Sequence, residues 1–340
     1  MTFMKHFNMV NIYFRLDVDK GIKHGIGHFF RSIQLYSKLK ELNCTFLVND
    51  IFFFKKLLKT YSIKYPKKII KFNITNFKKN YQPKTKNIFI FDTLGRDKKF
   101  KVFIKHLNSD NKIVSLEDRS IYTKYNDIVI NSKIYLLNKK TKKKNIFSDI
   151  KYTILRFKKK IGYKKLLRKK KYKILICSGG ADYKKLLFKV ASILLKFKNI
   201  EINCIVGPSV KKNDQIYGLS KKSSKIKLIT KTHKLEKNFR ENDIVITSGG
   251  TMMIESIFFS KPTYVVETFK HQKSIVEFFK KKKLIHFLGT VEEIDKKKIK
   301  NFVDNLNLKN KEINKMTKNS YNVIDGKGLI RVYKIIKKLI

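Results

Sequence analysis

The segment from Ile12 to Arg31 constrains the fold of this chain more than any other stretch. Hydrophobic and aromatic residues open it, as in a β-strand, and a polar turn then leads through Gly25-Ile26-Gly27-His28 into an apolar, helix-like segment over 29–42. A strand, a glycine turn and a helix in this order aim backbone N–H groups and the positive end of a helix at an anion. We predict that His28 lies in the first turn of this helix, where an imidazole can exchange protons near neutral pH. A tight turn that carries a solvent-facing histidine is the alternative.

Apolar runs separated by helical stretches repeat this design along the chain. The predicted strands cover residues 44–48, 87–91, 112–116, 174–177, 202–206, 225–229, 243–247 and 263–266. Strands that alternate with helices indicate parallel β-α-β units, and near-continuous apolar runs indicate strands covered on both faces. We therefore expect an α/β protein.

Length and a basic stretch predict two domains. A chain of 340 residues exceeds the usual size of one domain. Between Asn138 and Tyr172 the sequence is strongly basic and loses its strand pattern, apart from residues 152–156. We interpret this stretch as the crossing between an N-terminal domain of residues 1–165, which carries the His28 loop, and a C-terminal domain of residues 166–340.

Two further glycine turns follow predicted strands in the second half. They are Ser178-Gly179-Gly180-Ala181-Asp182 and Ser248-Gly249-Gly250-Thr251. Ligands of open parallel sheets bind outside the carboxyl ends of the strands, and glycine turns before helices favour a diphosphate. Glu255 follows the second turn, where its carboxylate either accepts hydrogen bonds from ribose hydroxyls or favours the helix dipole. The turns predict a phosphate-bearing ligand.

The strong positive charge leaves several partners open. The chain has 79 Lys and Arg against 26 Asp and Glu, a net charge of +53. Nucleic acid, anionic lipid and phosphate-bearing substrates all fit such a charge. However, the lysines are spread over the whole length, and the absence of Trp beside abundant Ile, Asn, Phe and Tyr is typical of a very A+T-rich genome. Because no nucleic-acid-binding module is recognised, we expect no specific nucleic acid, while peripheral contact with an anionic membrane stays open.

Cysteines and acidic residues give no metal-site pattern. Cys44, Cys177 and Cys204 lie in apolar runs without paired spacing, as small buried hydrophobes do. Asp17 and Asp19 resemble the acidic pair that holds a metal in some sugar-transfer enzymes, but we expect Asp17 to be structural or to contact a sugar. The chain has no apolar run of 18 residues and no signal peptide pattern, so we expect a cytoplasmic protein.

A series of short motifs resembles one known family in the same order. Phe14-Arg15-x-Asp17 followed by Gly25-x-Gly27-His28-x-x-Arg31 resembles the opening signature of UDP-sugar hydrolases of the pseudaminic-acid pathway and of related spore-coat polysaccharide proteins, which are similar to MurG-type glycosyltransferases. The blocks that follow are Asp92 with Gly95, Glu117-Asp118, Tyr152-x-x-Leu155-Arg156, Gly179-Gly180-Ala181-Asp182, Ser248-Gly249-Gly250-Thr251-x-x-x-Glu255, and Asp325-Gly326-Lys327-Gly328-x-x-Arg331-Val332. The resemblance covers nearly the whole chain. Two departures are a longer loop over residues 18–24 and His271-Gln272 where members commonly have Asn-Gln.

This resemblance implies a GT-B-like pair of Rossmann-like domains facing across a cleft, with UDP held mainly by the C-terminal domain. It implies hydrolysis of UDP-2,4-diacetamido-2,4,6-trideoxy-β-L-altropyranose or a close relative, with inversion, to release UDP and the free sugar for pseudaminic acid biosynthesis. His28 matches the catalytic histidine, which we assign as the general base, and no cofactor or metal is needed. The implied substrate-binding residues are Arg15, Asp17, Gly25, Gly27, Arg31, Asp92, Tyr152, Arg156, His271 and Gln272. The implied nucleotide-binding residues are Gly179, Gly180, Asp182, Ser248, Gly249, Gly250, Thr251 and Glu255.

Two alternatives to the hydrolase stay open. A GT-B glycosyltransferase of cell-surface polysaccharide biosynthesis would use the same UDP-sugar with a sugar or lipid acceptor in place of water. A basic nucleic-acid-binding protein without enzyme activity is the alternative of another class. The sequence leaves the exact sugar and the oligomeric state open.

Overall fold

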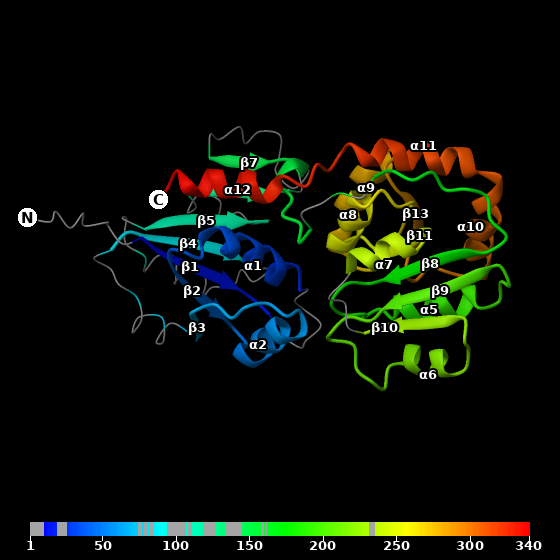
Figure 1. Cartoon of the computed structure of the whole chain (residues 1–340), viewed down its shortest axis with the longest axis horizontal. Coiled ribbons are helices and arrows are strands. Elements are labelled where there is room, and N and C mark those ends of the chain that lie inside the picture. The colour runs from blue at the N-terminus through cyan, green and yellow to red at the C-terminus, as the bar shows by residue number, and fades with distance from the viewer. Residues whose placement is uncertain are drawn as a thin grey trace, which may run out of the picture. The chain divides into compact units, whose positions relative to one another are not determined.

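The computed structural model describes residues 10–18, 26–73, 77, 81, 85–93, 107, 111–117, 127–132, 145–157, 160, 162–230 and 235–340. The chain divides into two compact units (Figure 1). The first comprises Met1–Arg156 with Lys327–Ile340, and the second comprises Phe157–Gly326. The sequence prediction placed residues 157–165 in the first domain and residues 327–340 in the second. The structure instead assigns residues 157–165 to the second unit and residues 327–340 to the first.

A parallel sheet forms the centre of the first unit. Within the described residues its strands lie in the order β3 (Lys68–Lys71), β2 (Asn43–Val48), β1 (Asn11–Leu16), β4 (Asn87–Asp92), β5 (Lys112–Leu116), β6 (Ile128–Asn131) and β7 (Ile146–Ser148). Every neighbouring pair is parallel. The strand order reverses between β1 and β4, where Leu16 pairs with Asp92 at the carboxyl ends. Such a reversal is the place at which open α/β sheets bind ligands.

Two helices near the start of the chain position residues at this edge. Helix α1 (Gly27–Leu39) buries Phe29, Ile33 and Leu35 in the core, so its first turn is fixed beside the end of β1. Helix α2 (Ile51–Thr60) follows β2 and is capped by Asp50, whose Oδ1 accepts a hydrogen bond from the Phe53 N–H at 2.8 Å. An aspartate at this position satisfies a backbone donor that the helix itself leaves without a partner.

The last helix, α12 (Gly328–Lys337), belongs to the first unit although it ends the chain. In Figure 1 it is the red helix beside α1. Val332, Ile335 and Ile336 enter the same hydrophobic core as β1 and α1. Burying each of these side chains stabilises the docked helix by roughly 1.5–3 kcal/mol. Gly328 begins the helix directly against the backbone of Thr153, where a Cβ would clash with the carbonyl group.

The second unit repeats the architecture of the first. In the part that the structure describes, its parallel strands lie in the order β10 (Ile226–Ile229), β9 (Ile200–Ile205), β8 (Tyr172–Cys177), β11 (Ile244–Ser248), β12 (Thr263–Glu267) and β13 (His286–Thr290). The helical segments are α5 (Leu186–Leu194), α6 (Gln215–Lys221), α7 (Leu235–Glu241), α8 (Thr251–Phe258), η4 (Lys270–Gln272), α9 (Lys273–Lys281), α10 (Lys296–Leu308) and α11 (Asn310–Tyr321). The strand order reverses between β8 and β11.

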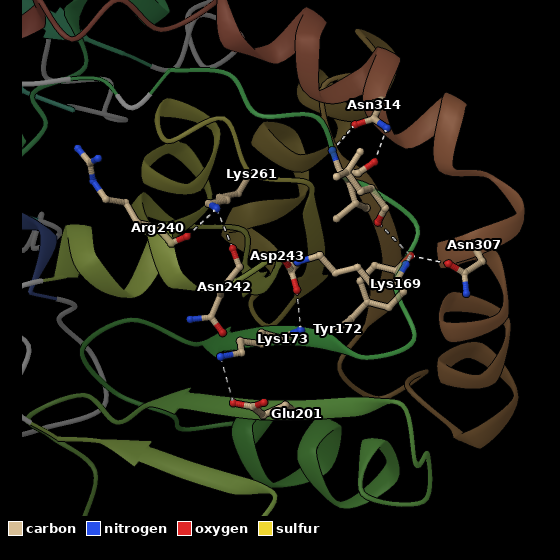
Figure 2. A network of polar contacts seen from close by, with 12 residues as sticks. Lys169, Tyr172, Lys173, Glu201, Arg240, Asn242, Asp243, Lys261, Asn307 and Asn314 are labelled. Atoms are coloured by element: carbon tan, nitrogen blue, oxygen red, sulfur yellow. Dashed lines mark hydrogen bonds and ion pairs between the residues drawn. The ribbon is translucent and has the colours of Figure 1, made fainter.

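A network of polar contacts secures the amino-end edge of this second sheet (Figure 2). Asp243, just before β11, accepts hydrogen bonds from the Lys173 N–H at 2.9 Å and from Lys169 Nζ at 2.5 Å. Lys261, just before β12, donates from Nζ to the carbonyl oxygen of Asn242 at 2.7 Å. Burial lowers the pKa of Lys261 to about 8. The Tyr172 hydroxyl donates to Asn307 Oδ1 at 2.6 Å, which joins β8 to α10. This network lies at the edge opposite the carboxyl ends of the strands.

Most predicted elements are confirmed. Each predicted strand overlaps an observed strand, and the α/β class with parallel sheets is confirmed. β3, β6, β7 and β13 were not predicted. Residues 152–156 also showed a strand-like pattern, but they form no strand in the structure. The chain there leaves the short 3₁₀ helix η3 (Ile150–Tyr152) and continues without sheet pairing, because β7 ends the sheet just before it.

Three further predictions concern the cysteines, a metal site and membrane-spanning helices. Cys44, Cys177 and Cys204 are buried, as predicted for small hydrophobic residues, and burial raises the pKa of Cys44 to about 12. Among the described residues no group of three or more His, Cys, Asp or Glu could hold a metal ion. Of the helices described, none is both long enough and apolar enough to cross a membrane.

Candidate functional site

His28, Arg31 and Asp92 form a buried cluster at the strand reversal of the first unit. Asp92 ends β4 and is fully buried, while His28 and Arg31 come from the first turns of α1. The His28 Nδ1 atom lies 2.5 Å from Asp92 Oδ1. Arg31 donates from Nε to Oδ2 at 2.9 Å and from Nη2 to Oδ1 at 2.6 Å. The bidentate pair holds the carboxylate in one orientation beside the imidazole.

The charges of this cluster stabilise one another. Burial by itself raises the pKa of the Asp92 carboxyl, but the Arg31 guanidinium and the His28 ring more than offset it, so the pKa lies below its ordinary value of 3.8. Burial by itself lowers the pKa of Arg31. Asp92, and after it Glu117 at the end of β5, more than offset this effect, so the pKa of Arg31 lies above its ordinary value. Asp92 is therefore an anion and Arg31 a cation at neutral pH.

This electrostatic arrangement fixes the tautomer of the histidine. An ionised carboxylate only accepts hydrogen bonds, so His28 must carry its proton on Nδ1 and donate it to Asp92. The contact of 3.1 Å between Arg31 Nη2 and His28 Nδ1 then joins two donors and is not a hydrogen bond. Nε2 of a neutral His28 keeps a lone pair and can accept a proton, as a general base does.

Arg15 and Asp17 lie next to the same sheet edge. Arg15, near the end of β1, forms an ion pair from Nη2 to Asp17 Oδ1 at 2.5 Å, and its guanidinium lies 4.3 Å from the centre of the Phe72 ring. Asp17 is buried. Both residues therefore have partners within the first unit, which fits the structural role that the sequence allowed for Asp17.

The other predicted substrate residues of the first unit are more scattered. Gly27 is the first residue of α1, so it brings His28 into the helix. Arg156 stacks its guanidinium 4.1 Å from the centre of the Phe30 ring, and Tyr152 ends the 3₁₀ helix η3 and packs edge-on against Phe147. Gly25, the side chain of His271, and the motif residues Asp19, Gly95 and Asp118 lie outside the described residues.

In the second unit the two glycine turns meet at the strand reversal. Ser248, at the end of β11, donates from Oγ to the Ser178 carbonyl oxygen, just after β8, at 3.1 Å. Gly179 has φ of +98°, a backbone conformation that side chains disfavour, and a Cβ there would point into open space. Gly250 precedes the first residue of α8, Thr251, so the start of that helix lies at the same edge. Backbone N–H groups of a helix start are well suited to bind a phosphate.

Gly207, after β9, is a part of this edge that the sequence analysis did not assign. Its backbone packs directly against the carbonyl oxygens of Gly179 and Gly180, and a Cβ would overlap them. The Ser209 N–H also donates to the Gly180 carbonyl at 3.0 Å. A glycine directly after an apolar strand is the signal that could have identified it.

Gly207→Ala should disturb the Gly179–Gly180 turn without removing any polar group from it. Because the added methyl group meets backbone oxygens rather than flexible side chains, we expect overpacking to cost about 1–3 kcal/mol of the free energy of unfolding. The measurement is urea unfolding of both proteins. As a control, Gly218→Ala in α6 adds the same methyl group in open space and should not destabilise the protein. Equal losses for the two variants would contradict the close packing at Gly207.

Asp182 caps a helix in this structure. Its Oδ1 and Oδ2 accept hydrogen bonds from the N–H groups of Leu186 and Leu187, each at 2.9 Å, at the start of α5. Burial raises the pKa of Asp182 to about 6, against the effect of these hydrogen bonds. Its proposed contact with a nucleotide stays a prediction, while its structural role in holding the turn is clear.

Gln272 belongs to the segment after β12, and Glu255 lies on α8, the helix that begins at this edge. Gln272 Oε1 accepts hydrogen bonds from both the N–H and the hydroxyl of Thr268, each at 3.0 Å. A Cβ at Gly249 would lie 3.1 Å from the Gln272 Cβ, so the loop after β12 packs on the turn after β11. Glu255, on α8, is only 1% exposed. The predicted contact between its carboxylate and a ribose stays untested.

A cavity of about 400 Å³ lies elsewhere in the second unit, between β13, α10 and α11. His286 lines it and stacks on Tyr264, with ring centres 4.5 Å apart and planes 13° apart. Burial lowers the pKa of His286 to about 4. This histidine packs against Tyr264 and is not part of the glycine turns.

Known proteins resemble this chain in sequence and in fold. No family model matches it. An uncharacterized protein of Methanocaldococcus jannaschii is 31% identical over 283 residues, which cover 78% of this chain and 57% of that protein. This chain therefore spans a little over half the length of that relative.

Solved structures resemble the whole chain. MurG of Acinetobacter baumannii matches with a TM-score of 0.63 and 12% identity, over 96% of this chain and 99% of that one. A putative UDP-N-acetylglucosamine 2-epimerase from Listeria monocytogenes matches with a TM-score of 0.65 and 12% identity, over 97% and 96%. The chain has a two-domain GT-B fold. The GT-B fold is thus confirmed, whereas the narrower resemblance to pseudaminic-acid hydrolases stays a prediction.

Proposed function

We propose that this protein hydrolyses a UDP-sugar, with His28 as the general base. The observation that carries the proposal is the contact of 2.5 Å between His28 and the buried Asp92, at the strand reversal of the first unit. A histidine that only packs or faces solvent needs no buried carboxylate and arginine to fix its tautomer. A histidine that accepts a proton in a reaction gains from both, because the carboxylate stabilises the imidazolium that forms.

The reaction needs one proton acceptor and a stabilised leaving group. The oxygen of a water molecule forms a bond to the anomeric carbon as its proton passes to Nε2 of His28. The bond between the anomeric carbon and the diphosphate oxygen breaks with inversion, and UDP leaves with that electron pair. In the second unit, the turns at Gly179–Gly180 and Gly249–Gly250 and the start of α8 offer backbone N–H groups for the diphosphate charge.

The identity of the substrate rests on two kinds of support. The opening signature, Arg15 to Arg31, resembles that of the pseudaminic-acid hydrolases, and one GT-B structure of similar fold is named for an enzyme of UDP-N-acetylglucosamine. We therefore propose UDP-2,4-diacetamido-2,4,6-trideoxy-β-L-altropyranose or a close relative as the substrate of a cytoplasmic enzyme. In this reaction, Arg31 and Asp92 would hold the His28 ring in its orientation.

A GT-B glycosyltransferase is the second candidate function. The fold likeness to MurG favours it as much as it favours a hydrolase. The net charge of +53 would also suit an acceptor on an anionic membrane surface. We place hydrolysis first because the A+T-rich codon usage that the amino-acid composition indicates would account for the charge, whereas it would not account for a histidine with a buried carboxylate partner.

The deciding experiment follows UDP release by purified protein in detergent-free buffer made with ¹⁸O-water. Under hydrolysis, UDP and free sugar form without an added acceptor, and ¹⁸O enters the C1 hydroxyl of the sugar. UDP release that requires a lipid-linked or sugar acceptor would support the transferase. Interconversion of UDP-sugars without net release of UDP would contradict both.

A further inference from the structure

An aromatic pair lies on the carboxyl-end edge of the second sheet, with Tyr183 half exposed and Phe269 partly buried. The rings of Tyr183 and Phe269 are stacked with centres 6.2 Å apart and planes 6° apart. Tyr183 follows the glycine turn after β8 and is 52% exposed, and Phe269 follows β12. Because the strands are parallel, both rings lie on the edge that carries the glycine turns. None of the functions considered above uses them.

The position of Tyr183 is fixed from both sides. Its neighbour Asp182 is buried and caps α5 through two backbone hydrogen bonds. Its other neighbour, Lys184, forms an ion pair from Nζ to Glu292 Oε1 at 2.6 Å, and Lys189 Nζ donates to the Val291 carbonyl at 2.6 Å. The segment that presents the tyrosine ring is thus held to α5 and to the chain after β13.

Phe269 is tied to the other glycine turn. Its neighbour Thr268 donates two hydrogen bonds to Gln272 Oε1, and Gln272 packs against Gly249. The stacked pair therefore joins the loops that follow β8 and β12. The loop after β8 contains the Gly179–Gly180 turn, and the loop after β12 packs against Gly249. A large aromatic ring that is half exposed yet held in one place has surface available for a ligand, because little of it serves the core.

We propose that the Tyr183–Phe269 pair is a stacking platform for a flat ring face of the nucleotide sugar. This inference rests on the proposed function, because it takes a UDP-sugar as the ligand. The chemistry is shared by two parts of such a ligand: the face of the uracil base and the C–H face of the pyranose ring. Both stack on aromatic side chains, and neither demands a charged partner. The glycine turns would hold the diphosphate between them, within reach of the platform.

The test measures the Kd of UDP and of UDP-N-acetylglucosamine by calorimetry for the wild type and for Tyr183→Ala. Loss of one stacking partner should weaken binding about 5- to 150-fold. Tyr183→Phe keeps the stacked ring and should bind as the wild type does. Tyr65→Ala removes a similarly exposed tyrosine, 48% exposed, from the first unit and should leave both affinities unchanged.

The two ligands separate the possible sources of stacking. An equal loss of affinity for both assigns the platform to the base, and a loss confined to UDP-N-acetylglucosamine assigns it to the sugar; either supports the proposal. Unchanged affinities in Tyr183→Ala, with binding by the wild type intact, would overturn the platform alone. A wild type that binds neither ligand would overturn the proposed function as well.

Discussion

Replacing His28 by alanine should lower turnover of the UDP-sugar by about 10²-fold or more, the contribution of a positioned general base. The affinity for UDP should stay nearly unchanged, because the proposed diphosphate site belongs to the second unit. The expected signature is thus a fall in kcat with little change in the Kd of UDP. Steady-state kinetics and calorimetry on the same preparation measure the two quantities.

Two further variants separate lost base chemistry from lost structure. His28→Gln fills much of the same space and can still hydrogen-bond Asp92, yet it cannot accept a proton, so its turnover should fall as far as in His28→Ala. Ser37→Ala lies on the exposed side of the same helix, α1, and should leave turnover unchanged. Near-normal turnover in His28→Gln would remove His28 from the role of base.

The sequence predicted the position of His28 better than its partner. The glycine turn before an apolar helix placed His28 in the first turn of α1, as observed. Asp92 was implied only as a substrate-binding residue, whereas in the structure it contacts His28 and Arg31. The two residues of that contact are 64 positions apart. Only the pairing of β1 with β4 brings them together, and no local pattern in the sequence records that pairing.

The glycine turns illustrate a second limit. Their positions after β8 and β11 followed from the apolar runs, and the structure places both at the strand reversal. Asp182 was expected at a nucleotide; in the structure it caps α5, and the nucleotide contact stays a prediction. From the sequence alone, a polar residue at the end of a turn can be expected either to bind a ligand or to cap a helix. Both roles require a hydrogen-bond acceptor, for hydroxyl donors of the ligand or for backbone N–H groups of the helix.

Two of the missed strands, β3 and β13, and the misplaced helix have physical causes too. β3 has a lysine at each end on a sheet edge, and β13 contains Gly289 with φ of +115° beside a register shift, so neither shows a clean apolar run. Helix α12 follows the second unit in sequence, but its apolar face completes the core of the first. Sequence order alone cannot show which core a terminal helix joins.

Asp92→Asn should destabilise the first unit by about 3–5 kcal/mol at neutral pH, the cost of leaving a buried charge without its partner. The substitution keeps the size of the side chain but removes the charge that Arg31 and His28 face inside the protein. Urea unfolding of the wild type and the variant, followed by a signal from the first unit, measures the difference.

The pH dependence of that difference has a definite sign. The folded-state pKa of Asp92 lies below its ordinary value of 3.8, so the unfolded chain takes up the proton more readily than the folded one. The stabilisation by the Asp92 carboxylate is therefore fully present well above pH 3.8 and is lost as the pH falls through the folded-state pKa. The gap in unfolding free energy between wild type and Asp92→Asn should therefore shrink in acid. Glu41→Gln removes an exposed acid from a surface ion pair in the same unit and should cost less than about 1 kcal/mol. A gap that stays constant down to strongly acidic pH would mean that Asp92 is not the buried anion on which the orientation of His28 depends.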